Sequence, residues 1–254
     1  TAEAISLLGG KPVFVDIGQD TCLMDPEKIE AAVTSRTRAV MPVSLFGQTA
    51  DMDAIHAIAE QHQLSVIEDA AQSFGASYKN KKSCALSALA CTSFFPAKPL
   101  GCFGDGGLIS TNDDKMFEHL NVLRNHGMSV RYHHTELGYN SRLDELQAVI
   151  LRAKLKRIDD YNDNRRRVDK AYKKYLGDSS VVTPYEDGIG KHVYHQYVCL
   201  HPQRDHIMKQ LQEAGVACAI YYPLPLHRQD VYQHANKDVS LPRSEAIVEQ
   251  CFAL

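Results

Sequence analysis

The chain has 254 residues, with 28 basic and 31 acidic side chains, and 44% of its residues are hydrophobic. This composition can fill a sizeable core, and the pI of about 6.4 gives no overall attraction to nucleic acid or to an anionic membrane. No stretch approaches the roughly 18 consecutive apolar residues of a membrane-spanning helix, so we expect neither nucleic acid nor a membrane as a partner. Seven cysteines without a C-x-x-C pair favour a reduced, cytoplasmic setting without a metal site or a disulfide framework.

Apolar runs and helical patterns alternate along the first half of the chain. Asp25 followed by Pro26 marks the start of one helix, and a glycine ends another. In chain order, we predict a strand at 12–17, a helix at 24–33, a strand at 38–47, a helix at 51–63, strands at 64–71, 89–95 and 106–112, and a helix at 113–127. Strands separated by helices of this length imply βαβ units, so we predict an α/β fold with a largely parallel sheet.

The character of the sequence changes after Ser141. Residues 142–176 keep an apolar helical period and then become basic, which predicts one long helix, straight or kinked, between two domains. A strand at 192–200, a helix at 204–215 and a strand at 216–227 predict a small α+β unit. We therefore divide the chain into a large domain at 1–141, a connecting helix at 142–176 and a small domain at 177–254.

The two ends of the chain are abrupt. The chain opens without an initiator methionine and stops in an apolar stretch, whereas domain termini usually lie at the surface. We therefore expect it to be an interior piece of a longer protein, without the N-terminal part of the large domain and the end of the small one.

The stretch SFFPAKPLGCFGDGG, at 93–107, places one lysine between two prolines and ahead of several glycines. Pro96 and Pro99 stiffen the backbone on either side of Lys98, and the glycines let the chain turn tightly and approach a ligand. A lysine amine is a nucleophile only when it is deprotonated, which requires a lowered pKa. Lys98 is therefore a candidate catalytic residue; the alternative is a surface lysine in a proline-rich loop.

Polar side chains follow the strand predicted at 64–71. Glu68, Asp69 and Gln72 lie at its carboxyl end, where α/β folds place ligands. An acidic residue there can pair with a protonated pyridine nitrogen, as pyridoxal phosphate requires. The alternative for Asp69 is a helix N-cap. Ser93 can offer its hydroxyl to a phosphate, or it is an ordinary serine at a strand end.

Four motifs carry a family resemblance. In order and spacing, EDAAQSFGA, SFFPAKPLGCFGDGG, LRNHG and LGYNSRLDELQAVIL resemble the nucleotide-sugar aminotransferases called the DegT or StrS family, and the similarity runs over the whole chain. The resemblance implies the pyridoxal-phosphate-dependent transferase fold of type I, with a mostly parallel sheet in a large domain and a small α+β C-terminal domain. It also implies transfer of an amino group to a keto nucleotide sugar. Some members carry histidine in place of the lysine and perform dehydration, and Lys98 argues against that branch.

The resemblance also implies how the cofactor is held. Lys98 would bond to it covalently and later move the proton between the substrate carbon and the cofactor. Asp69 would keep the pyridine nitrogen protonated, and Gln72 would contact the ring substituents. Ser93 would bind the phosphate. Asn140 would reach the phosphate in the neighbouring subunit, which predicts a homodimer with shared active sites.

Further motifs resemble the branch that acts on UDP-2-acetamido-2-deoxy-3-oxo-glucuronate, with glutamate as amino donor and bacterial surface polysaccharide as the destination. Arg142, from the partner chain, would meet the acidic part of the sugar. Tyr221, Tyr222 and His227 would lie near the sugar of the partner subunit, with a plain loop histidine as the alternative for His227. Many relatives have His-Tyr at 221–222, where this chain has two tyrosines.

Two features of the family pattern are not found in the chain. Relatives carry a Gly-Thr turn that holds the cofactor phosphate, and an aromatic residue that stacks on its ring, both upstream of TAEA. Two alternatives to the enzyme therefore stay open: a catalytically incompetent fragment, and a regulatory relative that keeps the fold. The joint presence of Lys98, Asp69, Gln72, Ser93 and Asn140 favours the enzyme.

Overall fold

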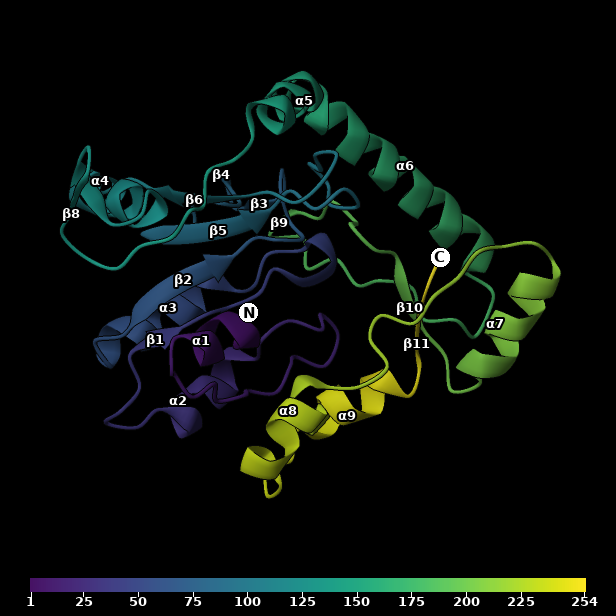
Figure 1. Cartoon of the computed structure of the whole chain (residues 1–254). Helices are drawn as coiled ribbons and strands as arrows, with labels where there is room; N and C mark the ends of the chain where they lie inside the picture. The colour runs from purple at the N-terminus through teal and green to yellow at the C-terminus, as the bar shows by residue number, and fades with distance from the viewer.

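The computed structural model describes all 254 residues, and its central feature is a four-stranded sheet of order β1-β2-β5-β6 (Figure 1). Its strands are β1 (Ala39–Val40), β2 (Ser65–Asp69), β5 (Leu89–Ser93) and β6 (Gly107–Thr111). β1, β2 and β5 run parallel, whereas β6 pairs antiparallel with β5. The predicted α/β fold with a mostly parallel sheet is therefore confirmed, and the carboxyl ends of β2 and β5 lie side by side.

One face of this sheet is covered by α3 (Met52–Gln61). Asp51 caps the helix by accepting a hydrogen bond from Ala54 N–H at 3.2 Å, and it also accepts one from the Tyr78 hydroxyl at 2.8 Å. Met52 and Ile55, both at most 2% exposed, pack into a core with residues of β1 and β2. This core fixes the strand whose end carries the candidate Asp69.

Short elements surround the sheet. In the first half they are α1 (Ala2–Leu7), η1 (Pro26–Lys28), α2 (Ile29–Ala32), η2 (Leu45–Gly47), β3 (Ser77–Tyr78), β4 (Lys81–Lys82), α4 (Asp114–Arg124), β7 (Met128–Val130) and β8 (His133–His134). The predicted cap is present, because the Asp25 side chain accepts a hydrogen bond from Glu27 N–H.

The long helix predicted at 142–176 is two helices. These are α5 (Glu145–Leu155) and α6 (Ile158–Leu176), separated at Lys156 and Arg157. They run along one side of the molecule, from the sheet to the unit that holds β10, β11 and α7 (Figure 1). The remaining elements are β9 (Gly190–Lys191), β10 (Val198–Leu200), α7 (Arg204–Glu213), η3 (Leu226–Arg228), α8 (Asp230–Gln233), η4 (His234–Asn236), α9 (Pro242–Val248) and β11 (Cys251–Ala253). None of the helices is long and apolar enough to cross a membrane.

Four strand predictions are wrong over most of their length, among them the one at 192–200, where only Val198–Leu200 is a strand. Residues 12–17 form only one bridge, from Ile17 to Met24. Here the side chain of Asp16 holds the segment instead, because it accepts hydrogen bonds from the backbone of Arg243 and Ser244. The strands predicted at 38–47 and 216–227 contain prolines, which have no N–H to donate to a ladder. In the first of them only β1 is a strand, and the second has a single bridge from Ala219 to Ala253.

Candidate active site

Lys98 lies in a compact loop after β5. Its backbone N–H donates to the carbonyl of Phe95 at 2.8 Å, and Cys102 N–H donates to the carbonyl of Phe94 at 2.8 Å. Gly101 packs so tightly that a Cβ there would lie 2.4 Å from the Pro96 carbonyl oxygen. The glycine is therefore required by close approach, and the loop that carries Lys98 is closed on itself.

The Lys98 amine has no hydrogen bond or ion pair within the chain, and half-burial lowers its pKa. The negative charge of Asp69 acts in the opposite direction but is the smaller influence. Burial disfavours the ammonium form, so a larger share of this amine is neutral than in a solvated lysine. The surroundings therefore meet the first requirement of a nucleophilic lysine, which the sequence could only suggest.

Asp69 is the last residue of β2 and is 7% exposed. One carboxylate oxygen accepts a hydrogen bond from Ala71 N–H at 3.1 Å, and the other accepts one from the Thr1 hydroxyl at 2.5 Å. The residues that follow form turns instead of a helix, so Asp69 is not a helix cap. A buried carboxylate with one donor on each oxygen is held in a fixed orientation beside Lys98.

Gln72 is buried and its amide orientation is fixed by a backbone group. Phe46 N–H can only donate, and it lies 2.7 Å from Gln72 Oε1. The amide nitrogen therefore faces the other way, where it donates to the Tyr222 hydroxyl at 3.0 Å. Phe46 adopts a φ of 58° in the turn before Gly47, an uncommon conformation for a large side chain.

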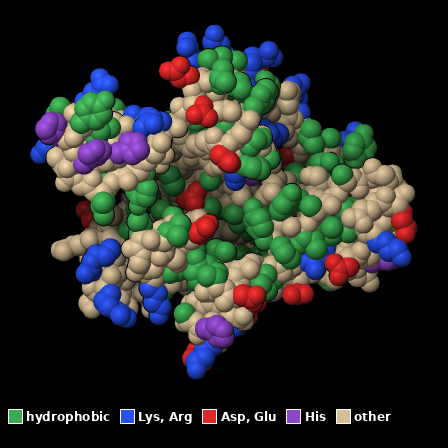
Figure 2. Space-filling model, viewed as in Figure 1, with side chains coloured by type: hydrophobic (Ala, Val, Ile, Leu, Met, Phe, Trp, Pro, Cys, Tyr) green, Lys and Arg blue, Asp and Glu red, His purple; other side chains and the backbone are tan.

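Tyr221, Tyr222 and His227 line the same cavity of about 1300 Å³ as Lys98, Asp69 and Gln72. Figure 2 shows hydrophobic side chains gathered around the central hollow of the molecule. Their predicted place near the sugar of the partner subunit stays a prediction; within their own chain the two tyrosines and the histidine line this cavity. The reason is the segment at 221–227, which returns to the sheet so that Tyr222 contacts Gln72 and its ring stacks on Phe46.

His227 differs from the two tyrosines because its side chain is only 1% exposed. Its Nε2 lies 2.8 Å from Glu245 Oε1, and a carboxylate can only accept, so this nitrogen carries a proton. Arg228 donates to the same oxygen at 2.9 Å. The geometry makes His227 a support for the cavity wall, since its buried nitrogens leave little surface for a ligand.

Ser93, Asn140 and Arg142 do not line this cavity. The half-buried Ser93 hydroxyl accepts a hydrogen bond from Phe95 N–H at 3.2 Å. Asn140 and Arg142 are exposed, just before α5, and Arg142 donates to the Asn125 side chain at 3.1 Å. Their predicted roles toward phosphate and toward the partner's substrate stay predictions.

Glu68 neighbours Asp69 in sequence but points to the opposite side of the sheet. It is 0% exposed and accepts hydrogen bonds from the Ser83 hydroxyl and from the N–H groups of Cys84 and Leu86, at 2.9 to 3.0 Å. Alternation along a strand could have separated the two carboxylates in advance. Glu68 thus anchors a loop and plays no part in the cavity.

Two further residues, near Asp69 and Gln72, were not predicted from the sequence. Thr1 donates its hydroxyl to Asp69, and the Phe46 backbone orients Gln72. Both contacts join segments that are 68 and 26 residues apart, and neither residue type is diagnostic of a site. Only the folded chain brings them together.

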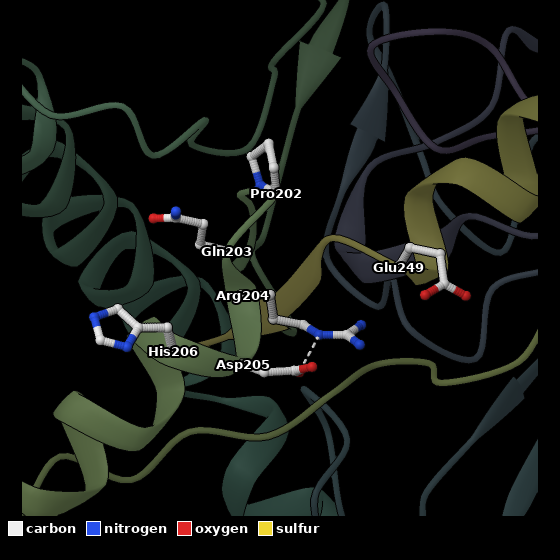
Figure 3. Close-up of a pocket in the computed structure, with 6 residues that line it drawn as sticks. All are labelled: Pro202, Gln203, Arg204, Asp205, His206 and Glu249. Carbon is white, nitrogen blue, oxygen red and sulfur yellow. Dashed lines mark hydrogen bonds and ion pairs between the residues drawn. The ribbon is translucent and has the colours of Figure 1, made fainter.

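A second hollow, of about 440 Å³, lies at the start of α7 (Figure 3). Arg204 there pairs with Asp205 at 2.9 Å, while His206 and Glu249 point away from each other in the close-up. None of the candidate residues lines it. Of these two cavities, the one beside Lys98 therefore holds the candidate catalytic and binding residues.

The residues around that cavity fit pyridoxal phosphate. The cofactor needs a lysine amine with a lowered pKa, a carboxylate for its ring nitrogen and a polar contact for its ring, and Lys98, Asp69 and Gln72 offer these three groups. When bound, pyridoxal phosphate stabilises the carbanion that remains after a proton leaves the substrate.

Comparison with known proteins identifies the family. The whole chain, residues 1–254, matches the DegT/DnrJ/EryC1/StrS aminotransferase family, and the chain belongs to it. It is 48% identical over 254 residues to the UDP-2-acetamido-2-deoxy-3-oxo-D-glucuronate aminotransferase of Pseudomonas aeruginosa, covering 100% of this chain and 70% of the relative. It is also 47% identical over 258 residues to a pleiotropic regulatory protein of Geobacillus stearothermophilus, covering 100% of this chain and 69% of the relative.

Solved structures agree with this assignment. The S. venezuelae protein DesV, in complex with a ketimine intermediate, superposes with a TM-score of 0.97 at 38% identity, covering 100% of this chain and 69% of that one. NtdA of Bacillus subtilis, with the bound cofactor PMP, gives 0.91 at 30% identity, covering 99% and 59%. The predicted family, fold type, cofactor and class of enzyme, a pyridoxal-phosphate-dependent sugar aminotransferase, are confirmed.

Proposed function

We propose that this chain carries the active site of an enzyme that transfers an amino group from glutamate to a UDP-linked 3-keto sugar acid, on the way to bacterial surface polysaccharide. The observation that carries the proposal is one cavity lined by Lys98, Asp69 and Gln72, with Tyr222 against Gln72. The relative from P. aeruginosa, similar along the whole chain, supports the sugar and its position.

Within this proposal each residue has a physical task. Lys98 would hold the cofactor and, as a neutral amine, take a proton from the substrate carbon and return it at the neighbouring atom. Asp69 would place a negative charge beside the ring nitrogen, and Gln72 would donate from its fixed amide. Tyr222 accepts from Gln72, so its own O–H is free to donate toward the sugar.

The proposal is tested with the full-length protein and pyridoxal phosphate. Glutamate alone should convert the cofactor to its amino form, seen as loss of the visible absorption, and a UDP-3-keto sugar acid should restore it. A 4-keto nucleotide sugar serves as the control substrate. Restoration by the 4-keto sugar alone would refute the sugar assignment. If neither glutamate nor other amino donors change the visible absorption of the bound cofactor, the result would favour a regulatory protein. The Geobacillus relative suggests this alternative.

We further propose that the protein is a homodimer with shared sites. Large apolar side chains are exposed on two elements: Leu146 at 79% and Val149 at 62% on α5, and Ile109 at 54% on β6. Large exposed apolar surface marks protein contacts. Asn140 and Arg142 lie at the start of this α5 surface, where they can extend into a site of a two-fold-related copy.

Mixing two inactive variants tests the shared site. A Lys98→Ala chain and an Arg142→Ala chain should each be inactive, and after subunit exchange about one quarter of the sites should regain both residues, because a hybrid dimer holds one intact site of two. Activity is measured after exchange has been verified by mass spectrometry. A mixture of two Lys98→Ala preparations is the control. No recovery in a verified hybrid would show that Arg142 does not serve the partner's site.

A further inference from the structure

The position of the Lys98 amine depends on the backbone that carries it. The amine makes no hydrogen bond or ion pair within the chain, so no contact of its own fixes where it lies. The loop is closed by Gly101 packed against Pro96 and by Cys102 bonded to the Phe94 carbonyl. The contacts that hold the C-terminal part of this loop, residues 101–104, therefore set how far the Lys98 amine extends into the cavity.

Two polar side chains of α5 hold this C-terminal part of the loop. Gln147 Oε1 accepts a hydrogen bond from Phe103 N–H at 2.7 Å. About two helical turns further on, Lys154 Nζ donates to the Gly101 carbonyl at 2.6 Å and lies 4.9 Å from the centre of the Phe103 ring. The Phe103 N–H and the Gly101 carbonyl are thus both hydrogen-bonded to side chains of α5. The Phe103 ring also lies beside the ammonium of Lys154.

The helix that makes these contacts is itself anchored beneath the loop. Leu151 and Ile158 pack with Phe94, Leu100 and Cys102 in one apolar cluster. Residues 147, 151 and 154 recur at the spacing that places them on one face of α5, and Ile158 is the first residue of α6. The polar contacts to the loop therefore flank an apolar contact to the same loop, so α5 holds the loop through both kinds of contact.

We propose that Gln147 and Lys154 are positioning residues for Lys98, holding the loop at 99–104 so that the amine stays half-buried at the cavity. The inference rests on the proposed role of Lys98 as the residue that holds the cofactor. Neither residue touches the cavity, so each acts only through the backbone of the loop. Loss of either contact lets the loop relax outward, and the amine gains water.

The test measures the Lys98 amine directly, in the full-length chain before the cofactor is added. Competitive acetylation by acetic anhydride over a pH series, followed by peptide mass spectrometry, gives the titration midpoint of each lysine. Gln147→Leu removes the acceptor without changing the charge, and Lys154→Met removes the donor but keeps much of the stem. Lys154→Arg keeps a donor and a charge. Arg152→Met is the matched control, because Arg152 and Lys154 are both basic residues of the last turn of α5.

Gln147→Leu and Lys154→Met should both raise the Lys98 midpoint toward that of an ordinary lysine, because burial is what lowers its pKa. Lys154→Arg and Arg152→Met should match the wild type. Once the cofactor is restored, Gln147→Leu should lower kcat about tenfold with little change in KM, as expected of a misplaced reacting group.

An unchanged Lys98 midpoint in both Gln147→Leu and Lys154→Met would overturn the positioning role. A shifted midpoint in Lys154→Met alone would also overturn it, because that result is explained by the lost charge. So would an equal shift in Arg152→Met, because that result is explained by a weakened helix. If Lys154→Met does not fold, Gln147→Leu decides. The labelling needs neither cofactor nor sugar, so its result tests the positioning role independently of the proposed reaction.

Discussion

Replacing Lys98 by alanine is expected to abolish amino transfer and the visible absorption of the bound cofactor. Lys11 is the other lysine that lines the cavity, but it is exposed, and Lys98 is the lysine whose pKa the charge of Asp69 influences, so we expect no other amine to take over the covalent bond or the proton transfer. Lys98→Arg should be equally inactive, because a guanidinium keeps the positive charge but stays protonated and cannot act as the nucleophile. Together the two variants separate the chemistry of the amine from its charge.

Borohydride reduction and peptide mapping give the direct measurement. Reduction fixes the cofactor to the lysine that holds it, and the modified peptide should contain Lys98. The exposed Lys79 and Lys82 pair with Asp53 and Asp159 and do not line the cavity, so they serve as internal controls. Label on either of them would disprove the assignment of Lys98.

Local patterns predicted much of the fold. The helix α3, the strands β2 and β5, and the helices α4 and α7 lie within a few residues of their predicted positions, because each has a clear apolar period and a clear end signal. The direction of β6 could not be read from its residues, since an antiparallel and a parallel strand have the same composition at this length. The division into domains at 141 and 176 stays a prediction.

Part of the candidate site was predicted from the sequence, and its predicted and unpredicted residues come together in different ways. Lys98, Asp69 and Gln72 follow parallel strands, and the geometry of such a sheet brings the ends of neighbouring strands together. Tyr222 reaches the same cavity from 150 residues away, so its contact with Gln72 depends on how the segment at 221–227 folds back. Long-range contacts of this kind have no local signature, so the contact between Tyr222 and Gln72 could not be predicted from the sequence.

Replacing Asp69 by asparagine is expected to leave cofactor binding intact but to slow transamination by roughly two orders of magnitude or more, the scale of losing one preorganised electrostatic contact. Asparagine has the same shape, and its oxygen can still accept from Ala71 N–H while its amide faces the Thr1 hydroxyl, which can accept. The substitution therefore removes the charge and little else. Without the charge, the proton on the ring nitrogen of the cofactor is no longer stabilised, and the carbanion is delocalised less well.

Glu68→Gln is the matched control, because it neutralises the adjacent carboxylate on the other side of the same strand. Glu68 satisfies three buried donors, so this variant should lose about 1–3 kcal/mol of unfolding free energy yet keep a near-normal rate while folded. Single-turnover rates with glutamate and denaturant unfolding measure the two effects separately. A near-normal rate for Asp69→Asn would show that its carboxylate serves only the turn at Ala71. Equal rate losses in both variants would mean that disturbance of β2, and not the charge at Asp69, limits the reaction.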